Sequence, residues 1–484
     1  MSMPAIDELV HTSAMGLALM VRRKKVSPLE LVDAFIGRIE AKNPEINAVV
    51  ANRFQQARDE AKAATERLAA TVAPDELPAL FGVPCTIKEG IAVKGMPHSA
   101  GVFARKQIRA EADAVVVRRL REAGAIVLGV TNMAEGGMWL ETDNRVYGRT
   151  VNPWDPERIP GGSSGGEAAI LGAGASGFGI GSDIGGSIRI PAAFCGIFGH
   201  KPSGKLVPNA GYWPDVPGKL DEFLCTGPMT RSAEDLWPVL DIVSGGKVTG
   251  HPDRVDLRDV TVFPVEAFGS VNVRPEARAA VRKASVALQT RGAKVAELRS
   301  RGLEKAFLIW SAMMEEEAAA LEYTELLGNG EKISVWRELL RHRTPEGRHT
   351  IQALIVAGID SLARRIPAPI ATYTRAGRQL REDLEAELGE HGVLVCPPYT
   401  RAAPRHLEPL RTPFDFVCTA IFNSLAFPVS QVPAGFDSAG LPLGVQIAGR
   451  RGADALTIAV ARALEVDLGG FTPARPRRAA GKAS

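Results

Sequence analysis

Residues 161–187 read GGSSGGEAAILGAGASGFGIGSDIGGS and hold 11 of the chain's 49 glycines in 27 positions. Because glycine has no side chain, a backbone this rich in it can turn sharply or approach another group closely. A flexible glycine and serine linker is the alternative interpretation, but the stretch ILGAGASGFGI is too apolar to be solvated. We therefore expect residues 161–187 to form a glycine-dense part of the core.

Two short motifs can be matched inside this segment, and each would predict a different function. The letters at 172–177 fit GxGxxG, but they lie at the end of a predicted helix and not after a strand, which argues against a dinucleotide site. The letters at 162–166 fit GxSxG, which would make Ser164 the nucleophile of an α/β-hydrolase with a histidine base further along the chain. That alternative stays open because six histidines follow: His200, His251, His342, His349, His391 and His406.

The sequence before this segment indicates the α/β class. Residues 113–130 read as a helix that ends at Gly124 and runs directly into the apolar strand AIVLGV, a unit typical of a sheet covered by helices. Nearer the start, Ser27, Pro28 and Glu30 supply a helix cap, a first-turn proline and a capping box. The helix that follows has an apolar face made of Leu31, Phe35, Ile36 and Ile39.

Changes of composition along the chain predict its organisation. Long, charged, helix-favouring stretches such as TRAGRQLREDLEAELG follow the glycine-rich part, and strand-like stretches such as LGVQIAG come after them. We expect one interleaved domain whose carboxyl-terminal part returns to the sheet. Its predicted regions are an amino-terminal helical region at 1–70, a core at 71–245, a mainly helical cap or variable region at 246–390, strands and a helix at 391–470, and a disordered basic tail at 474–484.

Composition excludes several function classes. The 58 Lys and Arg residues balance 55 Asp and Glu along the chain, which gives no reason to expect nucleic acid as a partner. The first twenty residues do not read as a secretory signal, and no run of about 18 apolar residues predicts a membrane span. Five scattered cysteines without a CxxC pair favour free thiols over a disulfide framework or a zinc site. We expect a soluble, cytoplasmic protein that acts on a small molecule and needs no metal or organic cofactor.

Taken whole, the segment resembles the amidase signature family. The elements GGSSGG at 161–166 and GSDIGGSIRIP at 181–191 match that family's paired signature, and FGVPCTIKEG places Lys88 at the position of its catalytic lysine. The stretches FGHKPSG and FLCTGPMTRSAEDLWPVL are similar to the fatty-acid-amide-hydrolase-like branch, and the resemblance covers most of the chain. It implies an α/β fold with a large central mixed β-sheet surrounded by α-helices.

The resemblance also implies the catalytic residues. An amidase must activate a nucleophile, stabilise an oxyanion and protonate the departing amine, because an amide is a poor electrophile with a poor leaving group. By resemblance, Ser187 is the nucleophile that forms an acyl-enzyme, Ser163 is the bridging cis-serine, and Lys88 is the base. Lys88 can act as a base only if burial lowers its pKa well below about 10.4. The apolar letters GVPCTI before Lys88 favour such burial.

An oxyanion hole is implied in the same family segment. Two glycines in a row permit conformations in which successive backbone N–H groups point into one concavity. The predicted members are Ile184, Gly185, Gly186 and Ser187. We expect Asp183 and Arg189 to fix this loop by hydrogen bonds and ion pairing.

Further residues are predicted to support the triad or to contact the substrate. Ser164 and Ser182 are expected to support the hydrogen-bond network around Ser163. By family analogy, the acyl side of the pocket is expected to include Met133, Gly136, Gly137 and Met138.

The leading functional hypothesis is hydrolysis of a hydrophobic acyl or aryl amide, with esters and carbamates as further substrates. One alternative within the family is the glutaminase component of a tRNA-dependent amidotransferase. The stretch KLVPNAGYWPD after HKPSG lacks the YGRVS-like letters associated with that component, which argues against it. A non-catalytic scaffold is disfavoured because all three triad positions are filled. The family resemblance is compatible with a homodimer.

Overall fold

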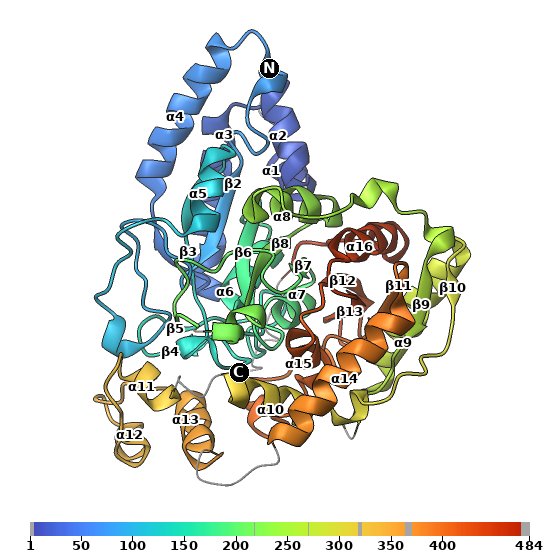
Figure 1. Cartoon of the computed structure of the whole chain (residues 1–484). Coiled ribbons are helices and arrows are strands. Elements are labelled where there is room, and N and C mark those ends of the chain that lie inside the picture. The colour runs from blue at the N-terminus through green and yellow to red at the C-terminus, as the bar shows by residue number, and fades with distance from the viewer. Residues whose placement is uncertain (1–3, 217, 270, 318–321, 364–369, 476–484) are drawn as a thin grey trace, which may run out of the picture.

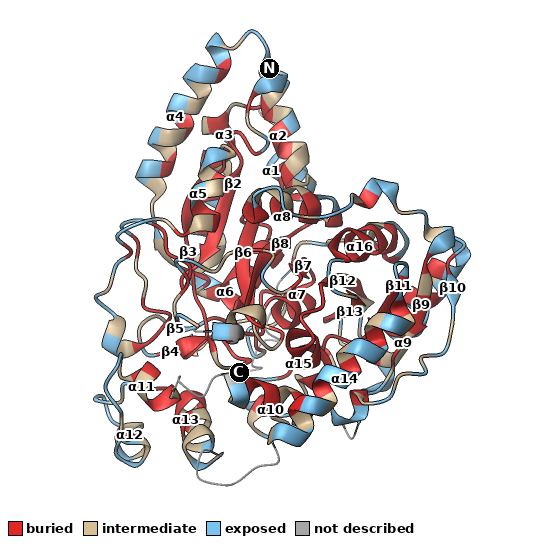
Figure 2. Ribbon diagram, viewed as in Figure 1, coloured by how far each residue is buried: buried red, intermediate tan, exposed pale blue. Residues whose placement is uncertain are grey.

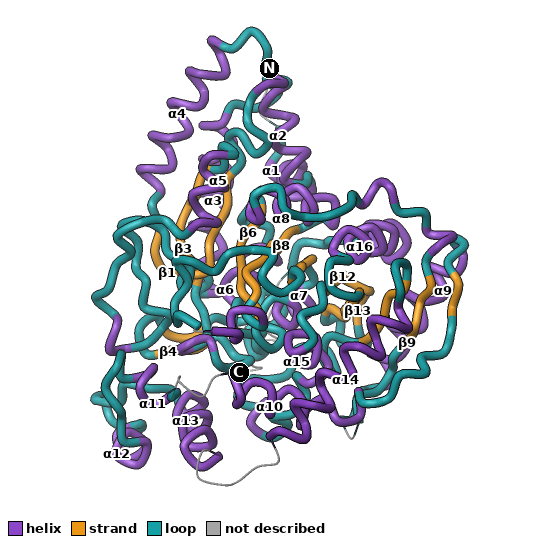
Figure 3. Tube along the Cα trace, viewed as in Figure 1, coloured by secondary structure: helices purple, strands orange, loops and turns teal. Residues whose placement is uncertain are grey.

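The computed structural model describes residues 4–216, 218–269, 271–317, 322–363 and 370–475. A single large sheet of eleven strands runs through this part of the chain, and helices pack around it (Figures 1 and 3). Neighbouring strands in the sheet are parallel in some pairs and antiparallel in others. The predicted α/β fold with a central mixed sheet surrounded by helices is therefore confirmed.

The order of strands across the sheet is β1-β3-β2-β6-β8-β7-β12-β13-β11-β9-β10. The strands are β1 Val49–Asn52, β2 Pro84–Lys88, β3 Ile126–Thr131, β6 Phe178–Asp183, β7 Phe198–Lys201, β8 Cys225–Thr230, β9 Thr261–Pro264, β10 Lys294–Val295, β11 Gly392–Cys396, β12 Val429–Phe436 and β13 Pro442–Gly449. A separate two-stranded ribbon consists of β4 Asp143–Asn144 and β5 Gly148–Arg149.

Helices cover the sheet. They are α1 Ile6–His11, α2 Ala14–Arg22, α3 Pro28–Ile46, α4 Phe54–Ala70, α5 Val115–Glu122, α6 Gly165–Gly172, α7 Arg189–Cys195, α8 Leu236–Ser244, α9 Pro275–Thr290, α10 Ala306–Glu317, α11 Tyr323–Leu327, α12 Val335–Arg341, α13 Ile351–Ala363, α14 Ile370–Leu388, α15 Val417–Ser424 and α16 Asp454–Leu468. None of the helices in the described ranges is long and apolar enough to cross a membrane.

The local signals in the first third of the chain produce the predicted elements. Ser27 and Glu30 form a capping box at the start of α3, and the predicted apolar face of that helix is buried. Helix α5 is followed by Gly124, whose φ of +89° suits glycine, and the chain then enters β3. Every residue of β2, β3 and β6 is buried, as expected for strands covered on both faces (Figure 2).

The glycine-rich segment is part of the core. It forms a buried loop, helix α6, strand β6 and a second loop that leads into α7. Glycine is required at Gly166, because a Cβ there would lie 2.5 Å from the backbone of Asn132. Strand β6 runs parallel to β2, with Ile180 opposite Ile87. The carboxyl ends of the two strands therefore meet at one edge of the sheet, which brings the predicted catalytic elements together.

The region 246–390 is mainly helical but also extends the sheet. Strands β9 and β10 lie at one edge, where β9 pairs with β11 in parallel. Helices α11, α12 and α13 form a group apart from α9 and α14, at the lower left of Figure 1. The expectation of a mainly helical cap is corrected by these two strands, which belong to the central sheet. They were missed because the short segments 261–264 and 294–295 lie among long helical stretches that dominate the composition.

The carboxyl-terminal part of the chain lies in the same sheet. Strands β11, β12 and β13 are neighbours of β7 and β9. Of the tail predicted to be disordered at 474–484, Ala474 is buried and its backbone N–H donates to the Gly172 carbonyl at 2.8 Å, because the chain end packs against helix α6. That expectation is corrected for Ala474, and residues 476–484 lie outside the described residues.

Candidate active site

Lys88 lies at the carboxyl end of β2 and is completely buried. Its Nζ donates to Ser163 Oγ at 2.7 Å and to Ser182 Oγ at 2.9 Å. Within the described residues, no carboxylate accepts a hydrogen bond from this lysine. The predicted burial of Lys88 is confirmed, and its two partners are hydroxyl groups, which can pass a proton on.

Burial changes the acid–base character of Lys88. It lowers the pKa of the ammonium group to about 7, against the opposing effect of the nearby carboxylates of Asp183 and Glu167. A lysine with this pKa is substantially neutral at physiological pH and has a free lone pair on Nζ. Lys88 therefore meets the condition for a general base.

Ser163 lies in the loop that precedes α6, and the Gly162–Ser163 peptide bond is cis. The side chain is 2% exposed, and the Ser163 carbonyl accepts from the Ala134 N–H at 3.2 Å. A Cβ at Gly162 would lie 2.5 Å from the Trp139 carbonyl oxygen, so glycine is needed for the close approach of this loop to residues 139–141. These contacts hold the Ser163 hydroxyl beside Lys88.

Ser187 lies in the loop between β6 and α7 and is half-buried. Its carbonyl accepts from the Ser164 N–H at 3.2 Å, which joins the two signature loops. The Ser187 hydroxyl makes no hydrogen bond to any residue that the structure describes. It is therefore more accessible than Ser163 and available to a substrate.

The backbone of the 184–187 loop has three unused donors. Within the described ranges, the N–H groups of Ile184, Gly185 and Ser187 donate to no protein acceptor. The N–H of Gly186 donates to Asp183 Oδ1 at 2.7 Å instead. The prediction that Gly186 belongs to the oxyanion hole is corrected for this reason, since its N–H is already bound to a carboxylate.

Glycine is nevertheless required at position 186. Its φ is +123°, and a Cβ would lie 2.2 Å from Thr419 Oγ1 on α15. The same Thr419 hydroxyl donates to the Gly185 carbonyl at 2.9 Å. Gly186 thus serves the shape of the loop.

Asp183 and Arg189 form a completely buried ion pair, with Arg189 Nη2 2.8 Å from Asp183 Oδ1. Asp183 also accepts from the N–H groups of Gly186 and Ile188 and from the Asn423 side chain. Burial alone would raise the pKa of Asp183, but the Arg189 guanidinium and these donors hold it well below its usual range. Asp183 is thus a permanent anion around which the loop is fixed.

Ser164 is buried and bonds to backbone. Its Oγ donates to the Ser182 carbonyl at 3.2 Å and accepts from the Ser182 N–H at 3.3 Å. Among the described residues no histidine hydrogen bonds to Ser164. The α/β-hydrolase alternative centred on Ser164 is therefore wrong, because this hydroxyl has no base and no exposure.

A histidine, a serine and an aspartate do meet elsewhere in the molecule. His200 contacts Ser430 Oγ through Nδ1 at 2.9 Å and Asp454 Oδ1 through Nε2 at 3.1 Å. All three side chains are buried, between β7, β12 and the start of α16. Since a substrate could not reach Ser430, this arrangement ties the three elements together and is not a second active site.

The four predicted pocket residues divide into two pairs. A Cβ placed on Gly137 would lie 3.5 Å from Met133 Cε and 3.9 Å from Ser163 Oγ, so Met133 and Gly137 lie near Ser163. Gly136 instead faces Leu326, and Met138 packs in the cluster formed by α11 and α13. A pocket role for Gly136 and Met138 stays a prediction, and the turn at Gly136 (φ +63°) directs these residues towards the helices.

The sequence analysis missed three aromatic residues that are functional candidates: Tyr212, Trp310 and Phe416. The Tyr212 hydroxyl accepts from Ser182 Oγ at 3.1 Å. Trp310 on α10 donates from Nε1 to the Ile184 carbonyl at 3.4 Å, and its ring meets that of Phe416 edge to face. No motif surrounds any of them, so the sequence carried no signal beyond their aromatic character.

Glu167 is a buried acid close to Lys88. Its carboxylate accepts from the hydroxyls of Thr86 and Thr131 and packs against Gly179, where any Cβ would clash with it. Burial raises the pKa of Glu167 to about 8, although both hydroxyls and the nearby Lys88 oppose this shift. Glu167 is therefore largely protonated at neutral pH, which limits its ability to hold Lys88 in the charged form.

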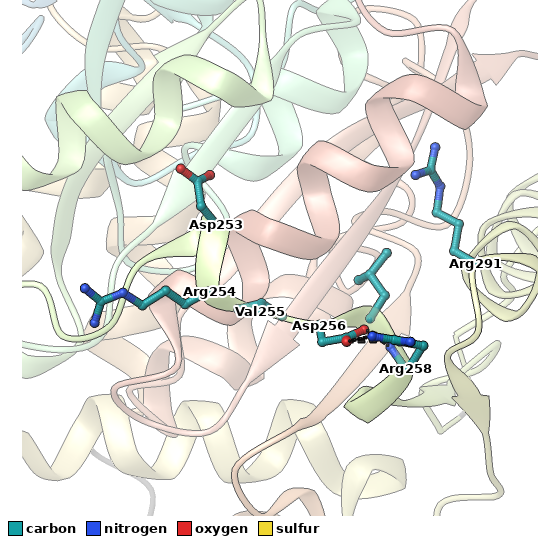
Figure 4. A pocket seen from close by; sticks show the side chains of 7 residues that line it. Asp253, Arg254, Val255, Asp256, Arg258 and Arg291 are labelled. Carbon is teal, nitrogen blue, oxygen red and sulfur yellow. Dashed lines mark hydrogen bonds and ion pairs between the residues drawn. The ribbon is translucent and has the colours of Figure 1, made fainter.

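Other parts of the described chain show no competing site. No group of three or more His, Cys, Asp or Glu side chains there could hold a metal ion. An open surface hollow of about 520 Å³ is lined by residues 253–258 and Arg291 (Figure 4). Its Arg258 and Arg291 are already paired with Asp256 and Asp467, and its lining does not include Lys88, Ser163 or Ser187. The hollow therefore offers no chemistry of its own.

Comparisons with known proteins agree with this geometry. The family model described as Amidase matches residues 30–458. Fatty-acid amide hydrolase 2-A of Danio rerio is 43% identical over 97% of this chain and 91% of the relative. A glutamyl-tRNA(Gln) amidotransferase component of Moorella thermoacetica is 32% identical over 95% of this chain and 97% of the relative. The structure of 6-aminohexanoate cyclic dimer hydrolase has a TM-score of 0.77 and 26% identity over 95% of this chain and 97% of that one.

Proposed function

The chain belongs to the amidase signature family of amide-hydrolysing enzymes, and from this premise we propose that it cleaves hydrophobic acyl or aryl amides through Ser187, Ser163 and Lys88. The predicted likeness to the fatty-acid-amide-hydrolase-like branch is confirmed by the relative at 43% identity. One observation carries the proposal. A fully buried lysine without a carboxylate partner lies 2.7 Å from the hydroxyl of a signature serine.

In the proposed mechanism, Ser187 Oγ attacks the carbonyl carbon of the amide. Its proton passes to Ser163 Oγ, and the Ser163 proton passes to the lone pair of Lys88 Nζ. The Ser187 hydroxyl has no hydrogen bond to the described residues, so the relay requires it to turn towards Ser163 when substrate binds. One C–O bond forms, and the carbonyl oxygen becomes an oxyanion.

In this proposal, free N–H groups of the 184–187 loop donate hydrogen bonds to that oxyanion. Donors from Ile184, Gly185 and Ser187 would stabilise the oxyanion by hydrogen bonding. Collapse of the intermediate breaks the C–N bond, and the Lys88 ammonium returns its proton through Ser163 to the leaving nitrogen. A water molecule, deprotonated by the same relay, then hydrolyses the acyl-enzyme.

The surroundings of the loop support an apolar acyl or aryl group. A Cβ on Gly185 would lie 3.6 Å from the Trp310 ring and 3.8 Å from the Phe416 ring. Met133 Cε lies 3.5 Å from the Cβ position of Gly137, which is itself 3.9 Å from Ser163 Oγ. Because these walls carry few hydrogen-bonding groups, the proposed preference is for hydrophobic amides, and the same nucleophile would accept esters and carbamates.

The decisive experiment measures hydrolysis of 4-nitroanilides from acetyl through dodecanoyl to benzoyl. Wild type, Ser187→Ala and Ser164→Ala are compared. Ser187→Ala is expected to abolish turnover, whereas Ser164→Ala keeps a measurable rate because the Ser164 hydroxyl contacts only the Ser182 backbone. Turnover retained by a correctly folded Ser187→Ala variant would refute the assignment.

The amidotransferase glutaminase remains the second candidate, because a component of such an amidotransferase is 32% identical over nearly the whole chain. The apolar walls around Gly185 favour the first candidate over a glutamine site. Ammonia release from glutamine distinguishes the two, and a rate above that for every nitroanilide would favour the glutaminase. The homodimer and the cytoplasmic location stay predictions, which light scattering and cell fractionation would test.

A further inference from the structure

The hydroxyl of Ser182 lies between Lys88 and a tyrosine that no signature motif contains. Lys88 Nζ donates to Ser182 Oγ at 2.9 Å, and Ser182 Oγ donates to the Tyr212 hydroxyl at 3.1 Å. Lys88 and Ser182 are at most 2% exposed, and Tyr212 is 9% exposed. The three groups form one chain of hydrogen bonds that ends at Tyr212.

Backbone contacts hold Tyr212 in this place. It forms an antiparallel bridge with Ile91, three residues after Lys88, and its N–H donates to the Asn209 carbonyl at 2.9 Å. Its hydroxyl also faces Gly137, where an added Cβ would lie 3.4 Å away. Within the described residues, Ser182 is the hydrogen-bond partner of the Tyr212 hydroxyl.

The protonation state of Lys88 determines the direction of each hydrogen bond between Lys88, Ser182 and Tyr212. For neutral Lys88 to act as a base, its single lone pair must face the Ser163 O–H. Lys88 then donates an N–H to Ser182 Oγ, and the Ser182 proton must point away from the lysine. After proton transfer, Lys88 has three N–H donors and no lone pair, so Ser182 Oγ must again accept a hydrogen bond from Lys88 Nζ. Both states require an acceptor for the Ser182 proton, and the Tyr212 oxygen provides it.

We propose that Tyr212 is a positioning residue that turns the Ser182 hydroxyl away from Lys88 and so reserves the lysine lone pair for Ser163. This inference rests on the proposed function. Without the Tyr212 oxygen, the remaining partner of the Ser182 proton is the Lys88 lone pair. Ser182 and Ser163 would then compete for it, and protonated Lys88 would lose part of its support.

The other ionisable groups around Lys88 are compatible with this role. Asp183 on β6 favours the protonated lysine, and Glu167 on α6 does so when it is ionised. The carboxylate of Glu89 contributes to raising the pKa of Tyr212. Burial raises the pKa of Tyr212 to about 12, so its hydroxyl is uncharged throughout the neutral range. Tyr212 therefore acts by hydrogen bonding and not as an ion.

The test compares kcat and KM between pH 5 and 10 for wild type, Tyr212→Phe and a control, Tyr373→Phe. The control removes the hydroxyl of a half-buried tyrosine on α14. Tyr212→Phe is expected to lower kcat by about 10- to 100-fold with little change in KM. Because protonated Lys88 loses support, the acid limb should also move to lower pH by roughly one unit. A variant with kcat within twofold of wild type and an unmoved acid limb would overturn the proposal.

A double-mutant cycle with Ser182→Ala separates positioning from packing. If Tyr212 acts through Ser182, Tyr212→Phe should cost little in the Ser182→Ala background, whereas fully additive losses would contradict the inference. The rate of labelling by a fluorophosphonate provides a second readout, and circular dichroism verifies folding. A wild-type protein that neither reacts with the fluorophosphonate nor cleaves any amide would overturn the proposed function. An active wild type together with a Tyr212→Phe variant whose kcat and acid limb are unchanged would overturn this inference alone.

Discussion

Lys88 Nζ and Ser163 Oγ are 2.7 Å apart in a site where no described carboxylate hydrogen bonds to the lysine. Taking an ammonium group out of water is costly, and burial lowers the pKa of Lys88, which makes this lysine a candidate for a functional group. The contact therefore links the burial of one strand end to the proposed proton relay.

Replacing Lys88 by methionine removes the base while it preserves the volume of a buried side chain. We expect Lys88→Met to lower kcat/KM by about 10²- to 10⁴-fold, the usual contribution of a general base. Lys201→Met is the matched control, since Lys201 is also fully buried but donates to the Pro202 carbonyl and Cys225 Sγ. Initial rates on one nitroanilide check this, and an equal loss in both variants would contradict a specific role for Lys88.

The rate of amide hydrolysis should rise with pH through the pKa of Lys88. Burial lowers that pKa to about 7, and only the neutral amine can accept the proton. Hydrolysis should therefore be slow at pH 5, half-maximal near pH 7 and constant above about pH 8 until another group titrates. The pH profile of kcat/KM checks the prediction. A midpoint below pH 5 would instead indicate a carboxylate as the base.

Burial of Lys88 should also cost stability in a pH-dependent way. Its pKa falls from 10.5 to about 7 on folding, so the unfolded chain binds more protons between these values, and stability rises with pH there. At about 1.4 kcal/mol per pKa unit, the cost at pH 7 is several kcal/mol. Lys88→Met should be more stable than wild type at pH 7, by less at pH 10. Thermal unfolding at both pH values tests this, and a variant that is less stable at both would contradict it.

Asp183 should be essential for the stability of the 184–187 loop. Asp183→Asn keeps the shape but leaves the fully buried Arg189 without its counterion, which costs about 3–5 kcal/mol. The free energy of unfolding in urea and the nitroanilide rate should both fall. Asp256→Asn breaks an exposed pair with Arg258 and should change neither. Equal effects of the two substitutions would show that the buried pair has no special role.

Trp310 should set the size of the acyl pocket. Its ring lies 3.6 Å from the Cβ position of Gly185, and Trp310→Ala would open space beside the 184–187 loop. We expect the preferred acyl chain to become longer and KM for the benzoyl anilide to rise about tenfold or more, since a buried aromatic contact is lost. Trp336→Ala, at a tryptophan that is 71% exposed, is the control. An unchanged chain-length profile in Trp310→Ala would place the acyl group elsewhere.

Much of the fold and the contact between Lys88 and Ser163 could be predicted because their signals are local or ordered along the chain. The capping box at Ser27, the stop at Gly124 and the density of glycine in 161–187 each describe the conformation of their own segment. The short strands β9 and β10 were not predicted. They have four and two residues inside a helical region, which is too short for an alternation of apolar and polar residues to be recognised.

The details of the site depended on residues far apart in the sequence. Whether the Gly186 N–H is free depends on where the Asp183 carboxylate turns. Whether Gly136 faces substrate depends on α11, nearly two hundred positions later. The aromatic residues Tyr212 and Trp310 reach the loop from segments with no motif. Neither spacing nor composition encodes such contacts.

The sequence by itself determined the family, the mixed α/β sheet and the residues expected to perform the chemistry, because these follow from residue types held at set spacings in continuous segments. Only the tertiary structure decided how Lys88 is buried, which backbone N–H groups remain unused and where the Ser182 proton points. The physical reason is that hydrogen-bond satisfaction and desolvation are set by groups that packing brings together, and these come from every part of the chain.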